Sequence, residues 1–135
     1  MTDFKQQFML RALQLGEQVR NKTGDNPWVG CVIVNDGQVL GEGYTHAYGG
    51  PHAEADAIQH AETQGHSLDG STLYCTLEPC SFHGRTPSCA KTIVEKNISH
   101  VVLAIRDPHP QVNGEGIRIL KAGGIRVTEG IEELA

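Results

Sequence analysis

The chain has 135 residues, of which 39% are hydrophobic and 20% are charged. This length allows one domain with its own hydrophobic core, and the composition excludes a disordered chain or a miniature protein that needs disulfides to fold. The formal net charge of −5 argues against general attraction to nucleic acids or anionic membranes, which favours small molecules as partners. No apolar run approaches the roughly 20 residues of a membrane span, and the polar N-terminus has no secretion signal, so we expect one cytoplasmic domain over 1–135.

The first half of the chain predicts a helix, a hairpin and a second helix. Apolar residues recur at helical spacing from Phe4 to Val19. Expected strands over 29–34 and 38–44 flank Asp36-Gly37, a dipeptide typical of tight hairpin turns. Small and apolar residues at helical spacing then predict the second helix: Ala53, Ala57, Ile58 and Ala61.

The second half alternates strands with helices. We expect strands over 72–76, 100–105 and 125–129. One helix is expected to begin at Thr86-Pro87 and to stop at a left-handed Asn97, and another to span 116–122 before Gly123-Gly124. Because such alternation requires crossover connections, the sequence predicts an α/β fold whose mixed five-stranded sheet carries helices on both faces.

Four residues carry the chemistry: His52, Glu54, Cys80 and Cys89. One imidazole and two thiolates make three zinc ligands and leave the fourth tetrahedral position open for water, as in catalytic rather than structural zinc sites. Cys89 would fall in the first turn of the helix after Thr86, where the helix dipole favours a thiolate. Glu54 is placed to take a proton from zinc-bound water and deliver it to a substrate, which is the general pattern of zinc deaminases.

The spacing of the cysteines is more specific than this pattern, because eight residues separate Cys80 from Cys89 where the general signature has two. Together with several other motifs, this extended loop resembles the deaminase domain of the riboflavin-biosynthesis deaminase/reductase family, over nearly the whole chain. Those motifs are Asn26-Pro27-x-Val29-Gly30, Gly49-Gly50-Pro51-His52-Ala53-Glu54, Thr76-Leu77-Glu78-Pro79-Cys80-Ser81, His83-Gly84-Arg85-Thr86-Pro87 and Asp107-Pro108-x-Pro110.

The resemblance implies a three-layer α/β/α cytidine deaminase-like fold and a zinc ion held by His52, Cys80 and Cys89. It implies a hydrolase that deaminates 2,5-diamino-6-ribosylamino-4(3H)-pyrimidinone 5′-phosphate by zinc-hydroxide attack, with Glu54 as proton shuttle. It also implies a homo-oligomer. The substrate-binding residues that it suggests are Asn26 at the ring, Arg85 and Thr86 at the phosphate, and Asp107 and His109 in a segment that approaches the substrate.

Three positions depart from the family pattern. Thr45 and Phe82 stand where the family usually has His, and His109 stands where it usually has Asn. A pocket with altered hydrogen-bonding groups discriminates among substrates differently, so a related deaminase of another aminopyrimidine or purine-like compound is the alternative. No reductase domain is expected within this chain, and a separate reductase would then use the product.

Two other functions are compatible with part of this pattern. A transfer RNA deaminase would share the zinc chemistry, but we would expect a basic track and more aromatic residues for stacking. A zinc-stabilised interaction module would need no Glu54 and would close the metal with a fourth protein ligand.

Other polar and glycine residues are expected to be structural. Cys31 and Cys75 lie in apolar strands, so we predict buried packing residues that bind no metal. Trp28 fits either a pocket wall or the core. Surface or capping roles are predicted for His46, His60, His66 and His100, and loop geometry for Gly41, Gly43, Gly49 and Gly50.

Overall fold

The computed structural model describes residues 6–18, 29–45, 53–77, 89–105 and 114–129. Its helices and strands follow the predicted order closely. They are α1 (Gln6–Gln18), β1 (Gly30–Asn35), β2 (Gln38–Tyr44), α2 (Ala53–Thr63), β3 (Thr72–Leu77), α3 (Cys89–Glu95), β4 (His100–Ile105), α4 (Glu115–Ala122) and β5 (Arg126–Thr128).

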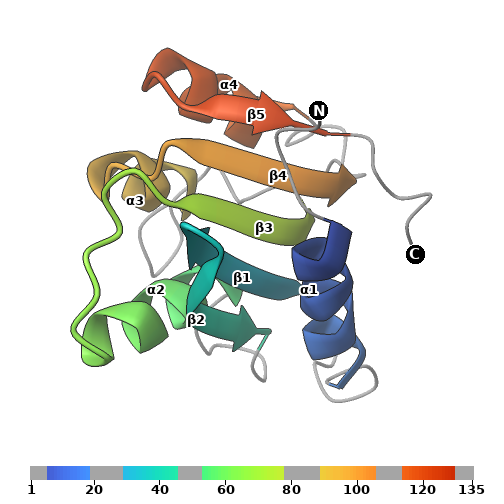
Figure 1. The fold of residues 1–135 in the computed structure, drawn as a ribbon. Helices are drawn as coiled ribbons and strands as arrows, with labels where there is room; N and C mark the ends of the chain where they lie inside the picture. Colours follow the sequence, from blue (N-terminus) through green and yellow to red (C-terminus); the bar gives the residue numbers. More distant parts are fainter. Residues whose placement is uncertain (1–5, 19–28, 46–52, 78–88, 106–113, 130–135) are drawn as a thin grey trace.

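The five strands form one mixed sheet in the order β2-β1-β3-β4-β5 (Figure 1). β1 pairs antiparallel with both β2 and β3, whereas β3, β4 and β5 run parallel. The predicted five-stranded mixed sheet is therefore confirmed, including the hairpin that precedes its parallel part.

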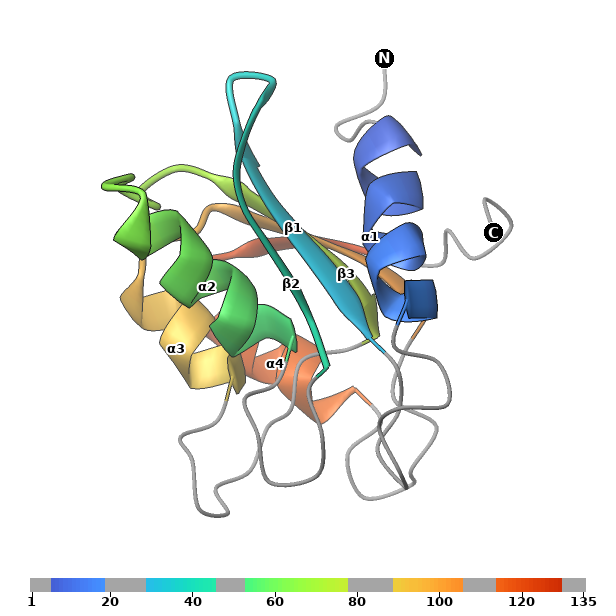
Figure 2. The same cartoon turned by 90° about the horizontal axis from the view of Figure 1, so that it is seen from below.

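The helices cover the two faces of the sheet unequally. Figure 2 shows α1 alone on one face, with α2, α3 and α4 on the other. Each face has its own cluster of buried side chains, and alternate residues of the strands contribute to one cluster or the other. This is the predicted three-layer α/β/α arrangement.

The predicted chain reversals also form. Asp36 and Gly37 both have positive φ, at 52° and 78°, as a tight hairpin turn requires. Asn97, with φ 61°, ends the segment after α3 in the left-handed conformation.

Two glycines were interpreted incorrectly as loop residues. Gly41 and Gly43 lie within β2, where a Cβ would come within 2.5 Å of the Ala57 carbonyl oxygen and 2.4 Å of the Ala53 carbonyl oxygen, respectively. The absence of a side chain lets the backbone of α2 approach the sheet this closely. These glycines therefore determine how near α2 lies to the strands.

The prediction for His100 was also wrong, because its side chain is 1% exposed rather than at the surface. It lies at the start of β4, and its Nε2 forms a 2.8 Å hydrogen bond with Oγ1 of Thr128 in β5. A buried polar group requires such a partner, and here the neighbouring strand supplies it.

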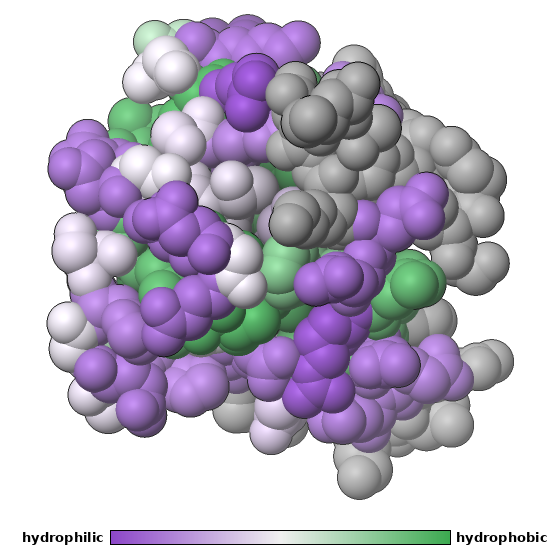
Figure 3. Space-filling model, in the orientation of Figure 1, coloured by the Kyte–Doolittle hydropathy of each residue, from purple (hydrophilic) through white to green (hydrophobic). Residues whose placement is uncertain are grey.

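The described surface seen in Figure 3 is mainly hydrophilic, with smaller apolar areas between polar side chains. Large exposed apolar residues among the described ones are Leu10 and Val39. No helix in the described ranges is both long enough and apolar enough to cross a membrane.

Candidate active site

Glu54 is the predicted chemical residue whose side chain the structure describes. It is the second residue of α2 and only 5% exposed, on the face of the sheet that carries three helices. Ala53, Ala57 and Ala61 are small and buried, and they bring this helix against the glycines of β2. The same close packing therefore holds Glu54 in the interior.

The predicted zinc ligands are described less completely. Cys89 is the first residue of α3, and α2 and α3 contribute buried residues to the same core cluster. His52, which directly precedes α2, and Cys80 lie outside the described residues. Their convergence with Cys89 stays a prediction.

The predicted substrate-binding residues also lie outside the described ranges. They are Asn26, Arg85, Thr86, Asp107 and His109. Phe82, Trp28 and the expected helix start at Thr86-Pro87 lie there as well. Every one of these roles therefore stays a sequence-based prediction.

Threonine hydroxyls accept hydrogen bonds from the backbone at the start of β1, which the sequence did not predict. The ladder between β1 and β2 ends at Gly30 and Tyr44, and one residue further the Val29 amide donates a 2.9 Å hydrogen bond to Thr45 Oγ1. The Thr45 amide in turn donates to the Val29 carbonyl oxygen at 3.0 Å. Thr45, which departs from the family pattern, thus directs its hydroxyl at the backbone.

Thr76 does the same on the other side of β1. The pairing of β1 with β3 ends at Cys31 and Cys75, and the Gly30 amide then donates a 3.2 Å hydrogen bond to Thr76 Oγ1. Thr76 precedes Cys80 by four residues, and Val29 follows Asn26 by three. The two hydroxyls therefore anchor strand ends that lead directly to predicted site segments.

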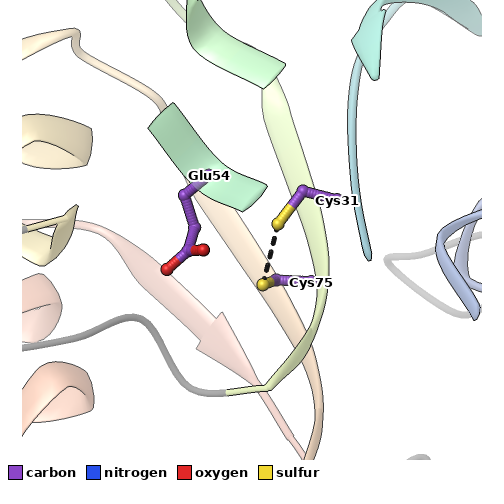
Figure 4. A group of neighbouring side chains, drawn as sticks. All are labelled: Cys31, Glu54 and Cys75. Carbon is purple, nitrogen blue, oxygen red and sulfur yellow. Dashed lines mark hydrogen bonds between the residues drawn. The ribbon is translucent and has the colours of Figure 1, made fainter. Parts of the chain in front are cut away.

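Cys31 and Cys75 are fully buried, as predicted, but they are also neighbours of Glu54. Their Sγ atoms lie 2.9 Å apart, and both are within 4.8 Å of a carboxylate oxygen of Glu54. Figure 4 shows the three side chains converging from β1, β3 and α2. Among the described residues this is the cluster whose ligand atoms suit a metal ion. The apolar residues around Cys31 and Cys75 predicted that both are buried. The contact between them becomes apparent only from the register of β1 with β3.

A described ion pair outside this cluster joins α1 to β2. Arg11 Nε and Nη2 donate to the two carboxylate oxygens of Glu42 at 2.7 and 3.0 Å. This hydrogen bonding is the main cause that lowers the pKa of Glu42, against a smaller opposing effect of burial. Its role is to fasten α1 to the sheet rather than to move protons in the reaction.

Comparisons with known proteins match this arrangement. The family model described as the cytidine and deoxycytidylate deaminase zinc-binding region matches residues 2–105. The riboflavin biosynthesis protein RibD of Chlamydia pneumoniae is 47% identical over 137 residues, which cover 98% of this chain and 35% of that protein. A diaminohydroxyphosphoribosylamino-pyrimidine deaminase of Buchnera aphidicola is 41% identical over 124 residues, covering 92% of this chain and 82% of the relative.

Solved structures agree with the sequence relatives. RibD of Acinetobacter baumannii has a TM-score of 0.89 and 46% sequence identity, over 96% of this chain and 36% of that one. The chain thus spans about a third of the length of these RibD proteins and most of the length of the Buchnera aphidicola deaminase.

Proposed function

The chain belongs to the cytidine and deoxycytidylate deaminase family, and from this premise we propose that it deaminates a phosphorylated diaminopyrimidine of riboflavin synthesis. The substrate we propose is 2,5-diamino-6-ribosylamino-4(3H)-pyrimidinone 5′-phosphate. Water replaces the exocyclic amine, and ammonia leaves. The observation that carries the proposal is the buried carboxylate of Glu54 at the start of α2, two residues after His52.

The donor set fits a zinc ion. His52, Cys80 and Cys89 offer one imidazole and two thiols, the ligand types that zinc prefers, and three protein ligands are typical of catalytic sites. Cys89 begins α3 on the face of the sheet that also carries α2. When bound, zinc supplies a Lewis acid that lowers the pKa of water.

Glu54 performs the proton transfers in this proposal. As a carboxylate it accepts one proton of the attacking water and donates it to a ring nitrogen. It then accepts the remaining proton from the newly added hydroxyl group and donates it to the departing amine, which leaves as ammonia. Its burial at 5% exposure keeps bulk water from competing for these protons. The carboxylate therefore returns to its starting state at the end of each turnover.

The phosphate is assigned to Arg85 and Thr86. A guanidinium and a hydroxyl close to an expected helix start form an anion site in a chain whose net charge is −5. Asn26 would hold the ring, and Asp107 and His109 would lie in a segment that approaches the substrate. This set provides the specificity for a ribose phosphate.

A second candidate substrate is favoured by Thr45. This position has no imidazole to offer the substrate, and its hydroxyl is hydrogen-bonded to the backbone of Val29 instead. A deaminase of another small aminopyrimidine, or of a purine-like base or nucleoside, would keep the same zinc chemistry. A transfer RNA substrate is disfavoured by the acidic balance of the chain.

The test is ammonia release from the zinc-loaded chain with a matched set of substrates. The riboflavin intermediate is compared with its dephosphorylated form, with cytosine and guanine, and with their nucleosides and nucleotides. We expect turnover of the phosphorylated intermediate and loss of kcat/KM when the phosphate is removed. Turnover of unphosphorylated bases alone would contradict the roles of Arg85 and Thr86, and turnover of none would contradict the proposed function.

We also propose that residues 1–135 form one deaminase domain that acts in the cytoplasm as a homo-oligomer and passes its product to a reductase. The small-molecule substrate follows from the relatives' names. Light scattering coupled to gel filtration measures the oligomeric state directly, and a mass equal to one chain would contradict that part.

A further inference from the structure

Cys31 and Cys75 are held opposite one another by two antiparallel strands. Their Cα atoms are register partners in the pairing of β1 with β3, although they are 44 positions apart in the chain. Both side chains are fully buried on the face of the sheet covered by α2, α3 and α4. The packing of the core therefore fixes the pair, and neither thiol has room to turn away without disturbing it.

This arrangement meets the geometric demands of a disulfide. Directly opposed residues of antiparallel strands have Cα atoms about 4.5 to 5.5 Å apart, which lies within the range of about 4.4 to 6.8 Å found in disulfides. The sulfurs need only close from 2.9 Å to about 2.05 Å. Side-chain rotation can supply that movement, so no strand has to shift.

We propose that Cys31 and Cys75 are a modification site, at which a small peroxide oxidant forms a disulfide that joins β1 to β3 beside Glu54. One thiol loses its proton, and the thiolate attacks a peroxide oxygen and breaks the O–O bond; the sulfur becomes a sulfenic acid, and the departing hydroxide takes up the proton to give water. The second thiol then attacks the sulfenic sulfur and releases another water. Two thiols and one hydrogen peroxide thus give one disulfide and two waters, so the sulfurs are oxidised as the peroxide is reduced.

The burial of the pair selects the oxidant. Neither cysteine exposes any surface, so bulky thiol reagents are excluded while the protein is folded. Hydrogen peroxide is close to water in size and enters a core during local opening. The reaction is therefore slower than that of an exposed cysteine but specific for small oxidants.

The new bond would change the surroundings of the carboxylate. A Glu54 oxygen lies within 4.8 Å of both sulfurs, and disulfide formation moves those sulfurs and removes both S–H groups. A displacement of about 1 Å at a reacting group can cost about 100-fold in rate, so we expect the oxidised protein to deaminate at least about tenfold more slowly. This consequence, unlike the disulfide itself, rests on the proposed function.

The experiment treats the zinc-loaded wild-type chain with hydrogen peroxide, blocks remaining thiols under denaturing conditions, and maps the products by mass spectrometry. Cleavage after Glu42 and Glu62 places Cys31 and Cys75 on separate peptides. We expect these peptides to remain joined until a reductant is added. Joined peptides in wild type but not in Cys75→Val support the proposal, since that substitution removes one sulfur and keeps the site apolar.

Two results would overturn it. One is a disulfide between Cys80 and Cys89 with Cys31 still blocked as a thiol. The other is a second equivalent of metal that wild type binds and that Cys75→Val and Cys31→Ala both lose, since the pair would then be a metal site.

The activity measurement separates this inference from the proposed function. The peptide map reads the disulfide even in a chain that deaminates nothing, so failure of the function leaves this test intact. Where reduced protein is active, slower turnover that dithiothreitol restores supports the link to Glu54, and full turnover of the disulfide form overturns that link.

Discussion

The two faces of the sheet differ in what their buried residues can do. The face covered by α1 packs Phe8, Met9, Val32, Tyr74 and Val102 into a cluster dominated by apolar side chains. The opposite face is also mainly apolar, but it contains Glu54, Cys31 and Cys75 where α2 meets β1 and β3. Both faces contribute to stability, whereas among the described residues the carboxylate and the two thiols come together on the face covered by α2.

On one face of the sheet, a single helix and its apolar cluster are enough to bury the strands. The other side needs the glycines of β2, because only they let α2 place Glu54 so close to the strands. If the comparison is correct, substitutions on the α1 face should change stability and leave turnover of the folded protein unchanged. A shape-preserving substitution of Glu54 itself should do the reverse.

The largest expected effect comes from Glu54→Gln, which removes the proton shuttle but preserves shape. General acid–base groups contribute about 100-fold to 10,000-fold, so we expect kcat for ammonia release to fall by at least about 100-fold. Zinc content and the unfolding temperature should stay at wild-type values.

The matched control is Glu62→Gln on the same helix. Glu62 pairs with Lys96 at 2.7 Å on the protein surface, and its substitution should leave kcat unchanged. Wild-type turnover by the Glu54 variant would eliminate the proposed mechanism.

Met9→Ala tests the other face. Met9 is fully buried in α1, and truncation of such a side chain costs about 2 to 5 kcal/mol because it leaves a cavity. Urea unfolding measures this loss, and kcat of the folded fraction should be unchanged. Leu10→Ala, at a neighbouring position that is 43% exposed, should change stability by less than about 0.5 kcal/mol. Equal losses in the two variants would contradict the packing described for α1.

Thr45→Val sharpens the comparison at the strand ends. It keeps the shape of Thr45 but leaves the buried Val29 amide without its acceptor, which costs about 1 to 3 kcal/mol. Because Val29 closely follows Asn26, KM should rise more than kcat falls. Thr45→Ser retains the hydroxyl and should recover most of both losses. If stability and KM depend on the volume of the side chain at position 45 and not on its hydroxyl group, the role of the hydrogen bond to Val29 is contradicted.

The smallest effect is expected from Arg11→Gln, which removes the ion pair between α1 and β2. The pair is partly exposed, so its loss should cost no more than about 1 kcal/mol at neutral pH. The pKa of Glu42 is lower in the folded chain than in the unfolded chain. Stabilisation by the pair is therefore present above the unfolded pKa and is lost as pH falls through the folded pKa.

Urea unfolding of wild type and Arg11→Gln across acidic pH measures this difference, and the two curves should converge at low pH. Arg118→Gln is the control, since Arg118 pairs with Glu115 within one helix, in a position more exposed than that of Arg11 and Glu42, and should show a smaller difference. A gap between wild type and Arg11→Gln that persists below the titration of Glu42 would contradict this assignment.

Much of the fold was readable from local patterns. Helical spacing, apolar runs and the residues that start and stop helices predicted the described elements, and Asp36-Gly37 and Asn97 act locally through their own backbone conformations. The errors arose where a partner lies far away in sequence. His100 is buried because Thr128 lies on the adjacent strand, and Gly43 is needed because α2 crosses it.

The site was predictable to a different extent. The motif around Glu54 predicted its catalytic role, which stays a prediction; the structure adds that its side chain is buried. The contact between Cys31 and Cys75 could not be predicted, since it depends on the pairing of β1 with β3, which neither strand specifies alone. The hydrogen bond between the Val29 amide and the Thr45 hydroxyl was likewise not predictable, since it depends on how the ends of β1 and β2 meet.

The strand order has a consequence for how the chain folds. The hairpin of β1 and β2 needs only a two-residue turn, whereas pairing of β1 with β3 must close a much longer loop that contains all of α2. Loop closure costs entropy before the contacts repay it, so distant pairings form slowly. We therefore expect the hairpin to be an early structure and the surroundings of Glu54 to be completed only when β3 docks, near the end of folding.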